Sequence, residues 1–304
     1  MLGAMAQNTI TLVMSPTEAP SVKETLLLAG FDMADAPYAF FRAKGTGCVA
    51  TFYEKGKMVL QGASAEDWAL HFQPDMKPPT HPFDDAMAKH PTPPPQRWAG
   101  IDEAGKGDYF GPLVVVAAGI DRSRVELLRE FGVADSKRLT DKRAHELAKI
   151  VKDFCPFRKV VIGPERYNAL YKKIGNLNRL LAWAHARALE DLLEHEPTIT
   201  WGLSDQFARD PRLVEGALLE RGKGIVFAQR TKAEADPAVA VASILARSEF
   251  LYQLKSLGSV AGRELPKGAG APVLAAAKQI VQKDGAAILN KIAKLHFKTT
   301  QEVT

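Results

Sequence analysis

Cysteine is scarce in this sequence of 304 residues, and long apolar runs are absent. The two cysteines, Cys48 and Cys155, have no Cys or His neighbours at ligand spacing, so they cannot form a zinc site by themselves. We expect them to be reduced, buried thiols of a cytoplasmic protein. No apolar run is long enough to span a bilayer, and the first residues lack a basic segment followed by an apolar one. We therefore expect neither a membrane span nor a secretory signal.

The composition is that of a soluble globular protein, with 46% hydrophobic and 25% charged residues. The length suits one large domain or two ordinary ones. Forty Lys and Arg residues stand against 35 Asp and Glu residues, which gives a formal net charge of +5. A basic balance of this size permits a polyanionic partner such as nucleic acid, but it does not require one.

Proline marks the clearest boundary in the chain. Eight of the 19 prolines lie between Pro74 and Pro95. Because proline removes a backbone donor and opposes helix formation, we expect an extended linker over residues 74–96. This linker would separate a small unit, residues 1–73, from a larger one, residues 97–304.

The small unit has the pattern of a strand, a helix, three strands and a helix. We predict these elements at residues 8–14, 21–30, 38–45, 48–56, 57–62 and 65–72. The cations expected on neighbouring strands are Arg42, Lys44, Lys55 and Lys57. They form either a solvated strand face or a surface that contacts phosphates, and the sequence leaves both interpretations open.

The larger unit has strands that alternate with helices. We predict strands at residues 98–104, 112–120, 158–163, 198–205 and 224–229, and helices at residues 141–151, 176–195 and 237–257. Two consecutive strands followed by alternating elements indicate an α/β sheet with helices on both faces.

Residues Gly100–Lys106 match the first seven positions of a phosphate-binding loop, G-x-x-x-x-G-K. Such a loop continues with Ser or Thr and opens a helix, whereas here Gly107 follows and Pro112 begins a β-branched run. The nucleotide-loop interpretation fails on both counts, and the glycines are better explained as a turn between two strands.

Two acids inside this stretch, Asp102 and Glu103, then become the candidates for chemistry. Adjacent residues of a strand face opposite sides, so the pair shares one site only if the strand ends or bulges there. Neighbouring carboxylates repel unless a cation lies between them, and hard divalent cations prefer oxygen ligands. The alternative is a charged strand end in solvent.

Two further acids favour the metal interpretation. Asp205 ends an apolar strand, which would place it at the carboxyl edge of the sheet. Glu234 lies just before a helix that we expect to begin with Asp236 as N-cap and Pro237 as first residue. Four acids placed in this way would converge on two metal ions about 3.5–4 Å apart, an arrangement used to hydrolyse phosphodiesters.

The motifs resemble the type 2 ribonucleases H, and within them ribonuclease HIII. The matching stretches are D-E-A-G-K-G at 102–107, D-S-K-R-L-T at 135–140, D-Q-F at 205–207, T-K-A-E at 231–234, A-S-I-L-A-R at 242–247 and K-L-H-F at 294–297. The sister family, ribonuclease HII, typically has Arg at the position of Lys106 and Asp at that of Glu234. The N-terminal unit is similar to the TATA-binding-protein-like domain typical of ribonuclease HIII.

This resemblance implies an RNase H-like mixed sheet flanked by helices, with a small N-terminal α+β domain. It implies an endonuclease that cleaves the RNA strand of RNA/DNA hybrids with Mg²⁺ or Mn²⁺ and leaves 5′-phosphate and 3′-hydroxyl ends. By motif match, the metal-binding catalytic set is Asp102, Glu103, Asp205 and Glu234. The expected substrate contacts are Gly105, Lys106, Gly107, Ser136, Lys137, Thr231 and Lys232.

Two other functions stay open at this stage. One is cleavage at single ribonucleotides embedded in DNA, as in ribonuclease HII. The other is a protein that binds nucleic acid without cutting it, although such a protein gains nothing from carboxylates that face phosphates. We expect a monomer without an obligate protein partner, because one duplex-binding site needs no second subunit.

Overall fold

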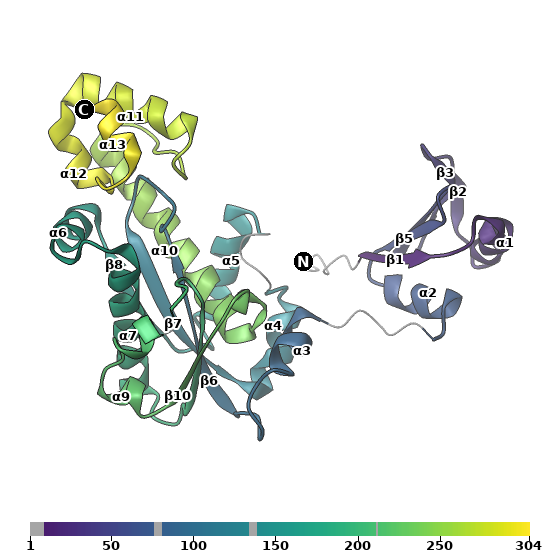
Figure 1. The fold of residues 1–304 in the computed structure, drawn as a ribbon. Helices are drawn as coiled ribbons and strands as arrows, with labels where there is room; N and C mark the ends of the chain where they lie inside the picture. Colours follow the sequence, from purple (N-terminus) through teal and green to yellow (C-terminus); the bar gives the residue numbers. More distant parts are fainter. Residues whose placement is uncertain (1–8, 76–80, 134–138, 211) are drawn as a thin grey trace. The chain divides into compact units, whose positions relative to one another are not determined.

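The computed structural model describes residues 9–75, 81–133, 139–210 and 212–304 (Figure 1). The chain divides into two compact units, Met1–His81 and Pro82–Thr304. Within the described residues, no helix combines the length and the apolar character needed to cross a membrane.

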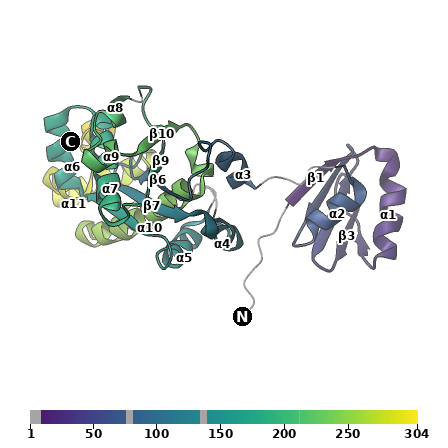
Figure 2. The same cartoon turned by 90° about the horizontal axis from the view of Figure 1, so that it is seen from below.

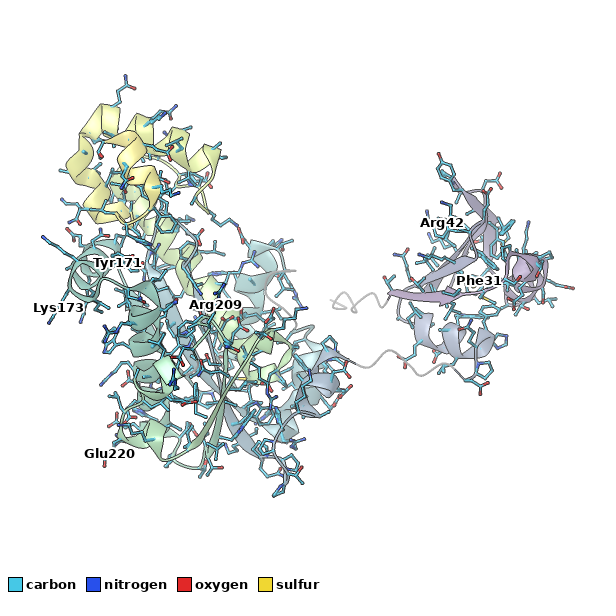
Figure 3. All side chains as sticks on the ribbon, in the orientation of Figure 1. Phe31, Arg42, Tyr171, Lys173, Arg209 and Glu220 are labelled. Carbon is cyan, nitrogen blue, oxygen red and sulfur yellow. The ribbon has the colours of Figure 1, made fainter. Side chains whose placement is uncertain are left out.

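The first unit is a five-stranded antiparallel sheet with the strand order β1-β5-β4-β3-β2. Its elements are β1 (Thr9–Val13), α1 (Ala19–Leu28), β2 (Asp32–Ala34), β3 (Ala39–Gly45), β4 (Cys48–Tyr53), β5 (Lys57–Gln61) and α2 (Ala65–Phe72). All six predicted elements are present, and β2 was not predicted. Side chains of both helices and of alternate strand positions form a single core, so α1 and α2 cover the same face of the sheet. Phe31, labelled in Figure 3, packs edge-on against Trp68 of α2 in this core.

The opposite face of this sheet carries polar and cationic side chains. Arg42 and Lys44 alternate along β3 with the buried residues Phe41 and Ala43, and Figure 3 shows Arg42 on the sheet. Lys57 begins β5, while Lys55 lies in the turn before it. Three of the four predicted cations therefore lie on the strands themselves.

The prediction of an extended linker over residues 74–96 is wrong over residues 82–87. Helix α3 (Pro82–Met87) occupies this stretch, and Phe83 is fully buried in the core of the second unit. Proline opposes helix only in the interior, because the first residues of a helix have no intrahelical partner for their N–H groups. Pro82 stands at this first position, so a proline-rich composition is compatible with the helix.

The second unit contains a mixed sheet with the order β10-β9-β6-β7-β8. Its strands are β6 (Arg97–Ala104), β7 (Leu113–Asp121), β8 (Phe157–Ile162), β9 (Trp201–Asp205) and β10 (Val226–Arg230). The pairs β6–β7 and β7–β8 are antiparallel, whereas β6–β9 and β9–β10 are parallel. The predicted mixed sheet is confirmed.

Two long helices cover the sheet from opposite sides, α10 (Pro237–Ala261) and α7 (Leu177–His195) (Figure 2). Along β7, Val114 and Val116 join the core that contains α10, while Leu113 and Val115 join the core that contains α7. Because both faces are buried, the strand is apolar throughout, and this explains its unbroken β-branched run.

The remaining helices surround these layers. They are α4 (Val125–Glu130), α5 (Asp141–Val151), α6 (Pro164–Ile174), α8 (Arg212–Glu215), α9 (Glu220–Lys223), α11 (Ala271–Asp284), α12 (Leu289–Ile292) and α13 (Lys298–Val303). Figure 1 shows α11, α12 and α13 gathered at the C-terminal end of α10. Only α5 among these eight helices was predicted.

Candidate active site

The acids Asp102 and Glu103 are the sixth and seventh of the eight residues of β6, which ends at Ala104. Along this strand Trp98 packs in the α10 core and Ile101 in the α7 core. The alternation directs Asp102 towards α10 and Glu103 towards α7. Both nevertheless line one pocket of about 560 Å³ together with Asp205. The strand ends at this point, as the sequence required for a shared site.

Asp102 is the more buried acid, with 8% of its surface exposed. Its Oδ1 accepts a hydrogen bond of 2.8 Å from the backbone N–H of Glu103, and Ser243 of α10 donates to the same carboxylate. Burial, together with the negative charge of Glu103, raises the pKa of Asp102 to about 8. The site therefore favours a positive charge next to Asp102.

Glu103 has a partner for each carboxylate oxygen. Its Oε2 lies 3.1 Å from Nε2 of His185, and its Oε1 lies 3.4 Å from Nζ of Lys106. Burial alone would raise the pKa of Glu103, but the hydrogen bond and charge of His185 and the charge of Lys106 outweigh it, and the pKa is lowered. Glu103 is therefore the ionised member of the adjacent pair.

Asp205 is the last residue of β9, the strand parallel to β6. Parallel neighbours end at the same edge of a sheet, which brings Asp205 beside Asp102 and Glu103. Its Oδ1 accepts a hydrogen bond of 3.1 Å from the N–H of Ala233. This bond fastens the end of β9 to the 3₁₀ turn η4 (Ala233–Ala235), which carries Glu234.

Glu234 itself is not among the residues that line the pocket. The helix start behind it is as predicted, because Asp236 caps α10 by accepting from the N–H of Ala238 at 2.9 Å and Pro237 is the first helical residue. The structure thus brings together three of the four predicted acids and leaves Glu234 in the adjoining turn.

The donor set suits a hard divalent cation, because the acids lining the pocket offer carboxylate oxygens. Among the residues that the structure describes, no three His, Cys, Asp or Glu side chains stand close enough to hold a metal ion as they are placed. The charge of Asp205 also raises the pKa of Asp102. Asp102, Glu103 and Asp205 are the residues that would hold such a cation.

The two glycines of the predicted substrate loop differ in whether the position could accept another residue. Gly105 has φ +87°, and a Cβ there would lie 2.2 Å from the carbonyl oxygen of Pro112, so no other residue fits. A Cβ at Gly107 would meet nothing within 4 Å, which leaves open space beside this exposed backbone. Lys106 lies between them, with Nζ 5.4 Å from the ring centroid of Phe207.

Among the described residues, the structure does not bring the other predicted substrate contacts into the pocket that contains the acids. Thr231 and Lys232 are exposed in the turn between β10 and η4, where Lys232 has φ +58°. Neither lines the pocket that contains the acids. Ser136 and Lys137 lie outside the described residues.

Several charged or polar residues of the site were not predicted, among them Arg247, Lys267 and His185. Arg247 of α10 and Lys267 line the pocket, and both donate to the carboxylate of Asp141 at the start of α5. His185 lies under Glu103. The only sequence signal for His185 is a single histidine inside an otherwise apolar helical stripe, next to Ala184.

Comparison with known proteins identifies the family. The model of the ribonuclease HII family matches residues 99–300, and a domain of unknown function matches residues 9–81. The ribonuclease HIII of Chlamydia muridarum is 35% identical over 292 residues, which cover 95% of each chain. The chain belongs to the ribonuclease HIII family. It is therefore a ribonuclease of the H type.

Solved ribonuclease HIII structures share the fold. Bst-RNase HIII in complex with Mn²⁺ matches with a TM-score of 0.66 and 27% identity, over 97% of this chain and 98% of its own. The Aquifex aeolicus RNase H3 matches with a TM-score of 0.56 and 28% identity, over 94% and 99%. The predicted RNase H-like fold, the small N-terminal α+β domain and the predicted family are confirmed.

Proposed function

We propose that this ribonuclease H hydrolyses the RNA strand of RNA/DNA hybrids and leaves 5′-phosphate and 3′-hydroxyl ends. The observation that carries the proposal is the pocket where Asp102, Glu103 and Asp205 meet at the carboxyl edge of β6 and β9. Carboxylates repel phosphates, so their presence in a nucleic-acid enzyme is explained by cations that they hold. A protein that only binds nucleic acid has no use for them.

Mg²⁺ or Mn²⁺ is the proposed cofactor, and Asp102, Glu103, Asp205 and Glu234 are its proposed ligands. The Mn²⁺ complex of the similar Bst-RNase HIII supports this choice. When bound, a pair of such ions supplies an activated water and neutralises the charge on the leaving oxygen. The bond from Ala233 to Asp205 ties the turn of Glu234 to the end of β9.

Residues of the chain itself position the substrate. Lys106 now contacts Glu103, and its side chain is about a third exposed, so it is free to turn from the carboxylate to an incoming phosphate. The backbone at Gly105 and Gly107 approaches the RNA closely because no side chain intervenes. Backbone groups at such short range distinguish RNA from DNA by contacting the 2′-hydroxyl.

The first unit is proposed to grip the hybrid through the sheet face that carries Arg42, Lys44 and Lys57. Cations that neutralise phosphates release counterions, so this part of the affinity falls steeply with salt. We further propose that the enzyme acts as a monomer in the cytoplasm. The free, buried thiols of Cys48 and Cys155 suit a reducing compartment.

Two labelled duplexes test the proposal, each incubated with the enzyme in Mg²⁺ and in Mn²⁺. One is an RNA/DNA hybrid, and the other is DNA that contains a single ribonucleotide. We expect rapid cutting of the hybrid and little cutting at the single ribonucleotide. Preferred cutting at the single ribonucleotide would favour the activity of the sister family, and no cutting of either duplex would refute the role of the carboxylates.

The variant Asp102→Asn separates an enzyme from a binding protein. It keeps the shape of the side chain and removes its charge. We expect it to abolish cleavage and to leave binding of the hybrid intact. Loss of binding together with cleavage would mean that Asp102 supports the fold rather than the reaction.

A further inference from the structure

His185 of α7 is fully buried and contacts two of the strands that end at the active site. Its Nε2 lies 3.1 Å from Oε2 of Glu103 on β6, and its Nδ1 lies 3.0 Å from the hydroxyl of Ser204 on β9. Ser204 is also fully buried and immediately precedes Asp205. Three residues from three elements thus form one chain of hydrogen bonds beneath the pocket.

The chemistry of these groups fixes where the hydrogens lie. An ionised carboxylate only accepts, so the contact with Glu103 requires the hydrogen of His185 on Nε2. The hydroxyl of Ser204 donates to the backbone carbonyl oxygen of Asp205 at 3.0 Å, so its oxygen is the acceptor for Nδ1 of His185. The ring is held in place from the side by Phe207, whose centroid lies 4.8 Å away. Ser204 therefore anchors Nδ1 of the ring, and Nε2 of His185 directs its N–H at the carboxylate of Glu103.

This donor occupies only one oxygen of Glu103. The other, Oε1, faces Lys106, whose side chain is about a third exposed. When Lys106 turns to a phosphate, Oε1 becomes available while Oε2 stays bound to the immobile imidazole. We infer that His185 is a positioning residue, which fixes the rotation of the Glu103 carboxylate so that Oε1 is presented to a divalent cation. This inference rests on the proposed function, because it needs a cation in the pocket.

The geometry of the strand explains why such a device is needed. Asp102 and Glu103 leave β6 on opposite sides, so only the end of the strand allows both to serve one centre. Asp102 is fixed by Ser243 of α10 and by the N–H of Glu103. Glu103 has a longer side chain with one more rotatable bond, and His185 supplies the matching constraint from α7.

Two amide variants of similar polarity provide a sharp test. Gln places its side-chain nitrogen near the position of Nε2, whereas Asn is one bond shorter and reaches only the position of Nδ1. We expect His185→Asn to weaken Mn²⁺ binding by about 10–100-fold, the usual effect of removing a group that orients a metal ligand. His185→Gln should recover most of that affinity. His195→Asn, on an exposed position of the same helix, is the matched control and should leave Mn²⁺ binding unchanged.

The measurement is titration calorimetry of the full chain with MnCl₂ in the absence of nucleic acid. Cleavage is then followed at saturating Mn²⁺, where kcat should fall for His185→Asn while the KM for the hybrid stays constant. Binding of the hybrid in EDTA should be equal for all variants. If His185→Asn does not fold, Ser204→Ala replaces it, because this variant keeps the imidazole and removes the hydroxyl that anchors its Nδ1.

Unchanged Mn²⁺ affinity in His185→Asn, or equal losses in the Asn and Gln variants, would overturn the positioning role alone. Failure of the parent chain to bind Mn²⁺ or to cut the hybrid would overturn the proposed function, and this inference with it. The two failures are therefore distinguishable in one set of experiments.

Discussion

Gly100 of β6 lies directly against the backbone of α10 at Ala238. A Cβ built on Gly100 would stand 2.1 Å from the carbonyl carbon of Ala238 and 2.2 Å from the nitrogen of Val239. Backbone atoms do not move aside as the end of a flexible side chain does. The absence of a side chain at Gly100 therefore sets how closely the first turn of α10 approaches the strand that carries Asp102.

The first prediction follows from this contact. Gly100→Ala forces β6 and α10 apart and should lower the free energy of unfolding by about 3 kcal/mol, as overpacking in cores does. Gly107→Ala is the control, because a Cβ there meets no atom within 4 Å. Urea unfolding measures both variants. Equal stability of the two would show that the helix shifts without cost.

A second prediction concerns Asp102 and pH. Because the folded state raises the pKa of Asp102 to about 8 from an ordinary 3.8, folding binds a proton between these values. The stability contributed by this group is complete below about pH 4 and is lost as the pH rises through about 8. In EDTA, Asp102→Asn should therefore become progressively more stable than the parent over this range. Thermal unfolding between pH 4 and pH 9 measures the difference in stability between the two proteins. Added Mn²⁺ should reduce this difference at the alkaline end of the range. If the thermal stability of the two proteins changed with pH in parallel, the raised pKa of Asp102 would be contradicted.

Lys294 leads to a third prediction. Its ammonium is fully buried and donates to the carbonyl oxygens of Asp108 and Gly111 at 2.7 Å each, which fastens the segment after the glycine loop. Burial lowers the pKa of Lys294 to about 7 from 10.5. The unfolded chain then binds more protons between these values, so the contribution of Lys294 to stability rises with pH from about 7 to 10.5 and is lost as the pH falls through 7.

The variant Lys294→Met lacks this titration and leaves the carbonyl groups without their donor. Relative to it, the parent should gain thermal stability between pH 7 and pH 10, as measured by the melting temperature of both proteins in a series of buffers. A constant difference across that range would mean that the carbonyl oxygens keep the ammonium charged in the folded state.

A fourth prediction tests where the catalytic unit begins. A chain that starts at Pro82 keeps Phe83 and His90, whereas one that starts at Arg97 loses both. The longer form should cut the hybrid at saturating concentration nearly as fast as the full chain, with weaker binding that depends less on salt. The shorter form should be less stable by about 3–5 kcal/mol, the usual effect of emptying the site of a buried phenylalanine. Equal melting temperatures of the two forms would show that residues 82–96 are only a connection.

Sequence patterns predicted the central layers because long, strongly patterned elements carry their own signal. The β-branched run of β7 and the apolar periodicity of α7 and α10 depend on burial along their whole length. The shortest elements were not predicted, because too few residues are present to carry such a pattern. The three residues of β2 are all at least partly exposed, and they form a strand only because β3 lies beside them. Helix α3 was missed because its proline was interpreted as a breaker.

The acids of the site were predicted for a different reason. Asp102, Glu103 and Asp205 end strands or lie near strand ends, and the edge of a sheet collects such residues whatever the details of packing. The place of Glu234 outside the pocket lining depends on the turn η4, which has no periodic pattern. His185 was missed because its function is defined by Glu103 and Ser204, which are 82 and 19 residues away. Pairings over such distances are determined by tertiary structure.

The buried contact of His90 with Asp236 has a consequence for the order in which the protein forms during synthesis. The Nε2 and Oδ2 atoms are 2.6 Å apart, yet the two residues are separated by 146 positions. Trp98 donates to the same carboxylate across 138 positions. At about 5–20 residues per second, the ribosome needs roughly 7–30 seconds to translate from His90 to Asp236. Throughout this interval His90 lacks its carboxylate partner, so the first unit has time to fold alone before the nuclease is assembled around the start of α10.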